Sequence, residues 1–287
     1  MKYTKRTLVV LSLALVGCRG QIMPASPTPV DTRLRIFSET ASTPLMHSLS
    51  AAYQPAHLLI GWDIQVGDLN ALSGWLKNNQ LSSQSAYALT TYLPPDSTLW
   101  STPIGQDGLA IIVNAANPIA NLTPDQLRTL FTGRVLNWKA LGGTDQPISV
   151  VSQQIGSSDN ALFQAMILGE RQVSGAARLA TTPEAMIQAV SADEGGIGYV
   201  SMGALSASMS MSTAATTIRT VPLDHVLPTP QTVSANQYAL RSPLLFVGLK
   251  VPENDAYHDF FAWVQSPAGQ AVVSKNYAPL AALASTP

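Results

Sequence analysis

The stretch "IGQDGLAIIVNAANPIANLTPDQLRTLFTGRVLNWKALGG", residues 104–143, carries the clearest local signals of the fold. Residues 108–114 form an apolar run, which is typical of a β-strand buried on both faces of a sheet. Thr123 then occupies the N-cap position of a helix, where Gln126 completes a capping box and Pro124 fits the first turn. A buried strand followed by a capped helix is the repeating unit of α/β proteins.

Strands and helices alternate along the rest of the chain. Short apolar runs bounded by turn residues predict strands at 33–38, 57–66, 85–93, 147–152, 196–201 and 243–249. Apolar residues at helical spacing predict helices at 43–53, 69–79, 158–168, 182–195, 254–265 and 267–276. This alternation predicts an α/β protein with mostly parallel sheets. Asp107-Gly108 is expected to form a turn, and residues 205–217 a surface insertion or a loose helix.

The composition limits the classes of partner. The 287 residues suffice for one large or two modest domains with real cores. Only 11% of the residues are charged and the net charge is −1, which argues against nucleic acid as a partner. The histidines are scattered without metal-ligand spacing, so no metal site is expected.

The first residues resemble a targeting segment. A basic start precedes an apolar run that is too short to span a bilayer. The run ends in Leu-Val-Gly-Cys, residues 15–18, which resembles the bacterial lipobox, in which the cysteine becomes the lipidated N-terminus. We therefore expect a signal peptide over residues 1–17 and a lipid anchor on Cys18, the only cysteine. The alternative is an ordinary signal peptide with an incidental cysteine.

Residues 18–31 follow this segment and are rich in Pro, Ser and Thr. Such a composition is typical of an extended linker. We expect these residues to tether a globular domain to the extracytoplasmic face of the cell membrane.

Several later stretches match one family in both order and spacing. The stretch that begins at Ile104, with its "DGLAIIVN", "LTPDQLRTLFTG" and "NWKALGG" parts, resembles the phosphate-binding proteins of bacterial ABC phosphate transporters. Three further stretches resemble the same family: "MIQAVSADEGGIGYVSMG" (186–203), "YALRSPLLF" (238–246) and "FFAWVQSPAGQAVVSKNYAPL" (260–280). The resemblance runs from about Arg33 to Leu280 and is strong from Ile104 onward.

The resemblance implies a type II periplasmic-binding-protein fold, a two-lobed α/β clamshell. Each lobe would contain a mixed, mostly parallel sheet flanked by helices. Residues 32–113 and 243–287 would form lobe one and residues 114–242 lobe two, with the solute bound between them. Such proteins capture a solute outside the membrane and pass it to an ABC permease. The resemblance thus implies a monomeric binding protein rather than an enzyme, with no cofactor and with phosphate or a related small oxyanion as its solute.

The family binds phosphate with three segments, and this chain departs from the family in each of them. By resemblance, the ligand-binding residues are Thr40, Ala41 and Ser42 in the first segment, Thr90 and Thr91 in the second, and Gly156, Ser157, Ser158 and Asn160 in the third. Glu39 stands where the family has serine, while Gln153 and Asn160 stand where it has arginines. Since a desolvated oxyanion needs several donors, backbone amides and hydroxyls would have to replace the missing guanidinium groups.

Several of these residues also have a purely structural interpretation. Thr40 and Ser42 fit a helix cap, Ser157 fits a cap after a tight turn, and Asp159 fits the favourable first turn of a helix. Glu39 fits either the cleft or the solvent. In the cleft its carboxylate would oppose an anion by roughly a few kcal/mol at an effective dielectric constant near 20.

Two other functions remain open from the sequence. Ser157 lies in a strand–turn–helix arrangement, but "QIGSSDN" lacks the G-x-S-x-G pattern of a nucleophile elbow, which disfavours catalysis. The departures at the binding segments leave a degenerate binding-protein fold as the other alternative. Such a protein would act as a surface sensor or scaffold, or would bind a different small solute.

Overall fold

The computed structural model describes residues 32–81, 85–210, 217–253 and 255–280. The expected signal peptide, Cys18 and the expected tether lie outside the described residues, as do residues 211–216 of the expected insertion. The described part of that insertion begins within a helix, Met202–Met209. No helix in the described ranges has both the length and the apolar character that are needed to cross a bilayer.

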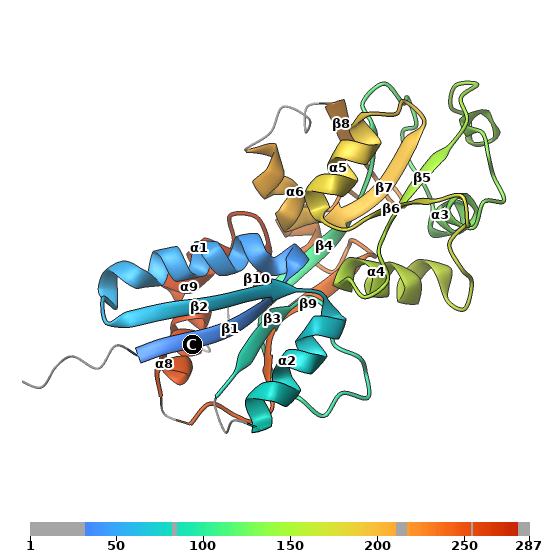
Figure 1. Ribbon diagram of the computed structural model, residues 1–287. Helices are drawn as coiled ribbons and strands as arrows, with labels where there is room; N and C mark the ends of the chain where they lie inside the picture. Colours follow the sequence, from blue (N-terminus) through green and yellow to red (C-terminus); the bar gives the residue numbers. More distant parts are fainter. Residues whose placement is uncertain (1–31, 82–84, 211–216, 254, 281–287) are drawn as a thin grey trace, which may run out of the picture. The chain divides into compact units, whose positions relative to one another are not determined.

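Strands and helices alternate as the sequence predicts (Figure 1). The strands are β1 (Thr32–Glu39), β2 (Ile60–Gly67), β3 (Tyr87–Thr90), β4 (Trp100–Asn114), β5 (Ser149–Gln153), β6 (Arg178–Ala180), β7 (Gly196–Ser201), β8 (Ile218–Val221), β9 (Arg241–Gly248) and β10 (Ala278–Pro279). The helices are α1 (Thr43–Tyr53), α2 (Leu69–Leu81), α3 (Pro124–Phe131), α4 (Ser158–Phe163), α5 (Pro183–Ser191), α6 (Met202–Met209), α7 (Pro230–Ser234), α8 (Ala256–Gln265) and α9 (Pro267–Val273).

The strands form a mixed sheet in the order β2-β1-β3-β9-β4-β7-β5-β6, with β8 and β10 also paired to β4. The pairs β1–β2, β1–β3, β5–β6 and β5–β7 are parallel, as the alternation of strands and helices predicts. The long strands β4 and β9 pair antiparallel with each of their partners. The sequence predicts a mostly parallel sheet, and the structure shows that the centre of this sheet is antiparallel. Periodicity cannot reveal this arrangement, because a buried strand has the same apolar pattern in either direction.

Strand β1 is buried on both faces because its successive side chains point to opposite sides of the sheet. Leu34 and Ile36 belong to an apolar cluster with residues of α1, α8 and α9. Phe37 points the other way and packs in a second cluster with Leu72 and Trp75 of α2. Helices therefore cover both faces of this half of the sheet.

The same alternation operates in the second half of β4. Leu109, Ile111 and Val113 share an apolar cluster with residues of α3 and α4, whereas Ala110 and Ile112 pack with residues of α5 and α6. The first half of β4, up to Gly108, pairs with β9, and the second half pairs with β7 and β8. Strand β4 therefore contributes to the apolar clusters of both halves of the sheet.

Two elements differ from the predicted boundaries, and the first difference has a clear physical cause. Strand β4 begins at Trp100, not at residue 108, and contains Asp107-Gly108, so the expected turn at these residues is wrong. Polar residues, a proline and a register shift between Pro103 and Gly105 obscure the strand pattern there. The predicted helix at 158–168 is α4 followed by a π-helical turn over Gln164–Leu168.

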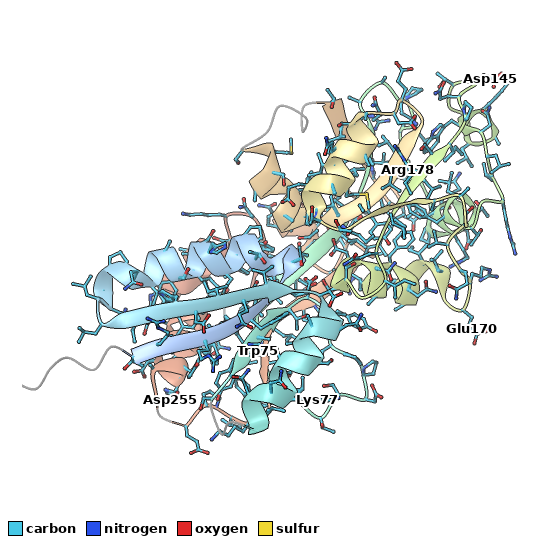
Figure 2. The ribbon with its side chains drawn as sticks, in the orientation of Figure 1. Trp75, Lys77, Asp145, Glu170, Arg178 and Asp255 are labelled. Atoms are coloured by element: carbon cyan, nitrogen blue, oxygen red, sulfur yellow. The ribbon has the colours of Figure 1, made fainter. Side chains whose placement is uncertain are left out.

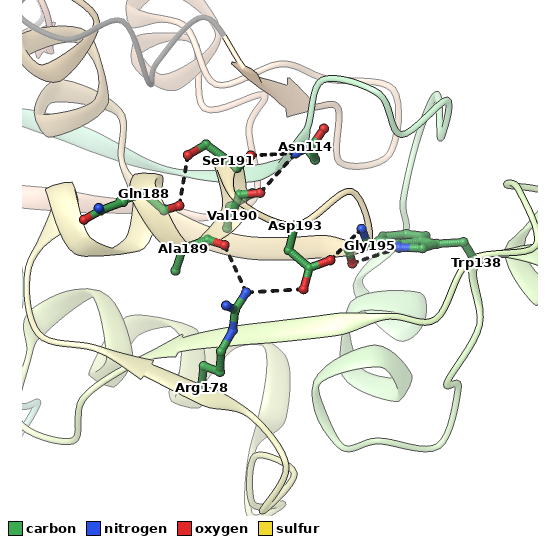
Figure 3. Close-up of polar contacts among 9 residues, drawn as sticks. All are labelled: Asn114, Trp138, Arg178, Gln188, Ala189, Val190, Ser191, Asp193 and Gly195. Carbon is green, nitrogen blue, oxygen red and sulfur yellow. Dashed lines mark hydrogen bonds and ion pairs between the residues drawn. The ribbon is translucent and has the colours of Figure 1, made fainter.

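Side chains from separate elements fix the end of α5, which precedes β7 (Figure 3). The Asn114 amide donates to the carbonyl oxygens of Val190 and Ser191, at 3.4 and 2.9 Å, and Arg178 donates to that of Ala189 at 2.9 Å. These carbonyls lie in the last turn of the helix, where partners within the helix run out, and the side chains add to the bonds that the Ala192 and Asp193 amides make to the carbonyl of Val190. The predicted helix at 182–195 accordingly ends at Ser191.

Candidate functional site

The carboxylate of Glu39 joins the end of β1 to the start of α4. Ser158 donates to it twice, from its hydroxyl to Oε2 at 2.7 Å and from its backbone amide to Oε1 at 3.5 Å. The backbone amide of Ala41 donates to Oε2 at 3.1 Å. Glu39, Ala41 and Ser158 are all buried. Of the two orientations that the sequence allows for Glu39, the structure has the buried one.

Residues from all three predicted binding segments meet at this point. Thr91, from the second segment, donates its hydroxyl to Ser158 Oγ at 2.8 Å, so that Thr91, Ser158 and Glu39 form a chain of hydrogen bonds. Thr90 is buried beside it but uses its hydroxyl locally, on the carbonyl oxygen of Tyr92. Whether these groups contact a ligand stays a prediction.

The hydroxyls of the first segment bind backbone carbonyls. Thr40 donates to Gly67 O at 3.1 Å, and Ser42 donates to Glu39 O and Leu89 O at 2.9 and 3.0 Å. These bonds fix the loop after β1 against the neighbouring strands. Ser42 lies at the N-cap position of α1, but its side chain makes no capping hydrogen bond there, so the expected cap is wrong. The side chain of Glu39 caps the short 3-10 turn at residues 40–42.

The third segment has the turn and cap that its sequence predicts. Ser157 is the N-cap of α4 and accepts a hydrogen bond from the Asn160 amide at 3.1 Å. Gly156 adopts a φ of +102°, a backbone conformation that strains residues with a Cβ, so this position favours glycine. The Asn160 side chain donates to Gln153 O and Tyr199 Oη, both at 3.2 Å.

Two further buried carboxylates lie close to this contact, and sequence reasoning missed the role of one of them. Asp107, expected in a turn, accepts hydrogen bonds from Ser201 Oγ and from the backbone amides of Gly108 and Gly203. Asp159 accepts one from the Ser201 amide at 3.0 Å, which adds a structural contact to its helix position. The sequence feature that could have indicated a buried Asp107 is its position directly before the apolar run at residues 108–114.

Burial raises the pKa of all three carboxyl groups. The pKa of Asp107 rises to about 7, because the loss of water outweighs the stabilising hydrogen bonds from Ser201, Gly203 and Gly108. Burial also raises the pKa of Glu39 against the opposing effect of its bonds from Ser158 and Ala41. The pKa of Asp159 is raised well above its usual value by burial and by the negative charges of Glu39 and Asp107.

No cation balances these groups within the described ranges. None of the three carboxylates forms an ion pair there, and no cluster of metal-ligating side chains occurs in that part of the chain. Asp145 and Glu170, by contrast, lie exposed at the outer edge of the ribbon (Figure 2). A buried charge without a partner is unfavourable, so protonation is the means left for these carboxyl groups to avoid it.

The free space at the Glu39 contact is small. A cavity of about 10 Å³ lies between the loop after β1, the start of α4 and the segment before α5, which is room for about one water molecule. Thr40 also lines a second cavity, of about 620 Å³, together with Thr43 and His47 of α1 and residues of α6. The donors around Glu39 therefore have no space for a further anion in this arrangement.

Known proteins share both sequence and fold with this chain. Residues 80–268 match the PBP superfamily domain. The phosphate-binding protein PstS of Borreliella burgdorferi is 22% identical over 61% of this chain, and PstS of Bacillus subtilis is 27% identical over 46% of it. The aligned regions span only 63% and 41% of those two relatives. These relatives are binding proteins rather than enzymes, which agrees with the expectation from the sequence.

A solved structure extends the likeness to most of the described chain. A putative phosphate ABC transporter substrate-binding protein from Clostridium perfringens, with bound phosphate, has a TM-score of 0.74 and 24% identity. The match covers 86% of this chain and 98% of that protein. At this level of identity the likeness establishes the fold. The chain therefore belongs to the PBP superfamily and has the fold of a type II periplasmic binding protein.

Proposed function

We propose that this chain is an extracytoplasmic solute-binding lipoprotein that captures phosphate, or a related small oxyanion, for an ABC importer. One observation carries the proposal. The amides of Ala41 and Ser158 and the hydroxyl of Ser158 converge on one carboxylate, which is an oxyanion. Donors so placed suit a small oxyanion, and they come from the segments that the resemblance assigns to the ligand. The phosphate-binding relatives support the same class of solute.

Capture would proceed by a hinge motion of two lobes, one of residues 32–113 and 243–287 and the other of residues 114–242. The separate apolar clusters on the two halves of β4 support a division into two lobes, but they group residues 109–113 with α3, α4, α5 and α6 of the second lobe rather than with the first. A solute that contacts both lobes would favour their approach by its differential affinity for the closed state. The ABC permease and the monomeric state belong to the same proposal.

The carboxylate of Glu39 would repel an anionic solute at this site. A phosphate ion that carries a proton can donate a hydrogen bond to a carboxylate, whereas a fully deprotonated oxyanion cannot. A second route is protonation of Glu39, whose pKa burial raises. Only the first route favours phosphate over sulfate, because sulfate has no proton to donate near neutral pH, whereas a protonated Glu39 can donate a hydrogen bond to either anion.

Thermal unfolding with candidate solutes tests the proposal directly. Phosphate, sulfate, molybdate, a neutral sugar and an amino acid are compared at equal ionic strength on the domain from residue 32 onward. A solute at about a thousand times its Kd stabilises the native state by roughly 4 kcal/mol, which raises the Tm by several degrees. We expect such a rise with phosphate. A rise with the sugar or the amino acid alone would contradict the phosphate assignment.

A second candidate function follows because the donors of Ala41 and Ser158 already bind the carboxylate of Glu39. Because Glu39 already uses them and the adjoining cavity measures only about 10 Å³, the fold can also serve as a surface sensor or scaffold without a small ligand. Family membership does not exclude this function, since one fold supports several functions. The absence of a Tm shift with every solute would favour it over transport.

The lipid anchor is tested separately. With Cys18 acylated, we expect the chain to stay in the membrane fraction and the Cys18→Ser variant to be released, because the lipid chains provide the apolar surface that holds it there. Fractionation of cells that express each form, with antibody detection, measures the effect. If the variant remained in the membrane fraction as fully as the unaltered chain, the lipoprotein assignment would fail.

A further inference from the structure

The side chain of Glu39 occupies the place of an anion. Its two carboxylate oxygens accept from Ser158 Oγ, Ser158 N and Ala41 N, so that one carboxylate connects the loop after β1 with the start of α4. An oxyanion solute would need these same donors. We propose that Glu39 is an internal competitor for the solute site, and that an anion binds only when this carboxylate leaves its donors.

Space supports this inference independently of charge. The cavity beside Glu39, of about 10 Å³, holds about one water molecule. Phosphate has five heavy atoms and cannot enter while the carboxylate remains in place. Ser42 cannot replace the lost donors, because its hydroxyl binds the carbonyl oxygens of Glu39 and Leu89.

The charges around Glu39 act in the same direction. Asp159 of α4, Asp107 of β4 and Asp68, which precedes α2, all repel a negative charge on Glu39. Tyr277, after α9, is buried near the same carboxylates and its hydroxyl has no hydrogen-bond partner. None of the described residues pairs Glu39 with a cation. Removal of Glu39 therefore removes one of several negative charges that oppose an incoming anion.

Specificity follows from the competition. A solute must bind these donors more strongly than the carboxylate does. Glu39 thus acts as a selectivity residue that disfavours weakly bound anions. The identity of the solute rests on the proposed function, whereas the competition rests on the contacts of Glu39.

Phosphate binding to three matched variants tests the inference. Glu39→Ala empties the donors, Glu39→Gln keeps most of the volume without the charge, and Glu184→Ala removes an exposed carboxylate beside the second cavity without freeing any of these donors. Isothermal titration of inorganic phosphate at pH 7.5 gives each Kd, and a thermal melt of each variant confirms that it is folded.

We expect Glu39→Ala to bind phosphate at least tenfold more tightly than the unaltered chain, which corresponds to about 1.4 kcal/mol. Glu39→Gln should lie between the two, and Glu184→Ala should stay within about twofold. Glu39→Gln serves as the decisive variant if Glu39→Ala is unfolded.

The outcomes separate this inference from the proposed function. If only the Glu39 variants bind phosphate, the competition stands and phosphate is not the native solute. If the unaltered chain binds phosphate and the Glu39 variants bind it equally or less well, the competition is overturned and the phosphate assignment stands. If no variant binds phosphate, the competition for an anion site is overturned as well.

Discussion

The folded chain is expected to lose stability as the pH rises from about 4 to about 7, by about 4 kcal/mol through Asp107 alone. The pKa of this carboxyl is about 7 in the folded state, against an ordinary value of 3.8. The folded state therefore binds the proton more tightly than the unfolded state, and its stability falls with pH between these two values. The loss is complete above pH 7. Glu39 and Asp159, whose pKa values are also raised, act in the same direction.

Urea unfolding at pH 4, 5, 6, 7 and 8 measures this slope, with Asp107→Asn as the variant. Asparagine can keep the bonds from the Gly108 and Gly203 amides on its oxygen, while the Ser201 hydroxyl turns to accept from its amide. Since asparagine does not ionise, we expect the variant to match the unaltered chain near pH 4 and to exceed its stability at pH 8.

The exposed Asp96→Asn is the matched control and should leave the slope unchanged. A slope that survived in Asp107→Asn would show that this carboxyl does not carry the effect. Stability that rose with pH in the unaltered chain would contradict the sign itself.

The sequence predicted the strands and helices well wherever a local rule decides them. The capping box at Thr123 and Gln126 forms as expected, and β1 and β7 lie at the predicted residues. The first half of β4 escaped prediction because its strand character comes from pairing with β9, far along the chain, and not from its own polar composition. Tertiary pairing overrides local propensity in such segments.

The candidate site was predicted in its segments but not in its central contact. Thr91, Ala41 and Ser158 do come together, which a family resemblance can indicate from order and spacing. No local pattern says whether Glu39 turns to solvent or to Ser158, a residue 119 positions away along the chain. The roles of Glu39 and Asp107 depend on long-range packing, and only the fold reveals them.

The missing arginines and the buried carboxylates are connected in physical terms. Amide and hydroxyl donors that converge without an oxyanion would remain unsatisfied, and a buried unsatisfied donor is unfavourable. Glu39 satisfies those donors from within the chain. The carboxylate that weakens the site for an external anion therefore also maintains the contact between the two loops when no solute is present.

The largest single effect of a substitution is expected at Phe163, the aromatic anchor of α4. Its ring is fully buried, stacks on Tyr199 with centroids 4.1 Å apart and meets Phe131 at 4.5 Å. Truncation of a buried phenylalanine to alanine removes these contacts and leaves a cavity, which typically costs 3–5 kcal/mol. We therefore expect Phe163→Ala to lower the free energy of unfolding by about 4 kcal/mol, measured by urea unfolding.

Met166 provides the matched control, because it lies one turn further along the same helical segment and is 42% exposed. Met166→Ala should cost less than about 1 kcal/mol. Equal losses in the two variants would show that α4 does not depend on its aromatic anchor.

Tyr199 also binds Ser152, Gln153 and Asn160 through its hydroxyl. Loss of the ring stack should therefore also weaken the position of Ser158 at the start of α4. We expect Phe163→Ala to lower the free energy of unfolding by less in a chain that already carries Glu39→Ala, because that variant has already lost the contact between Glu39 and Ser158.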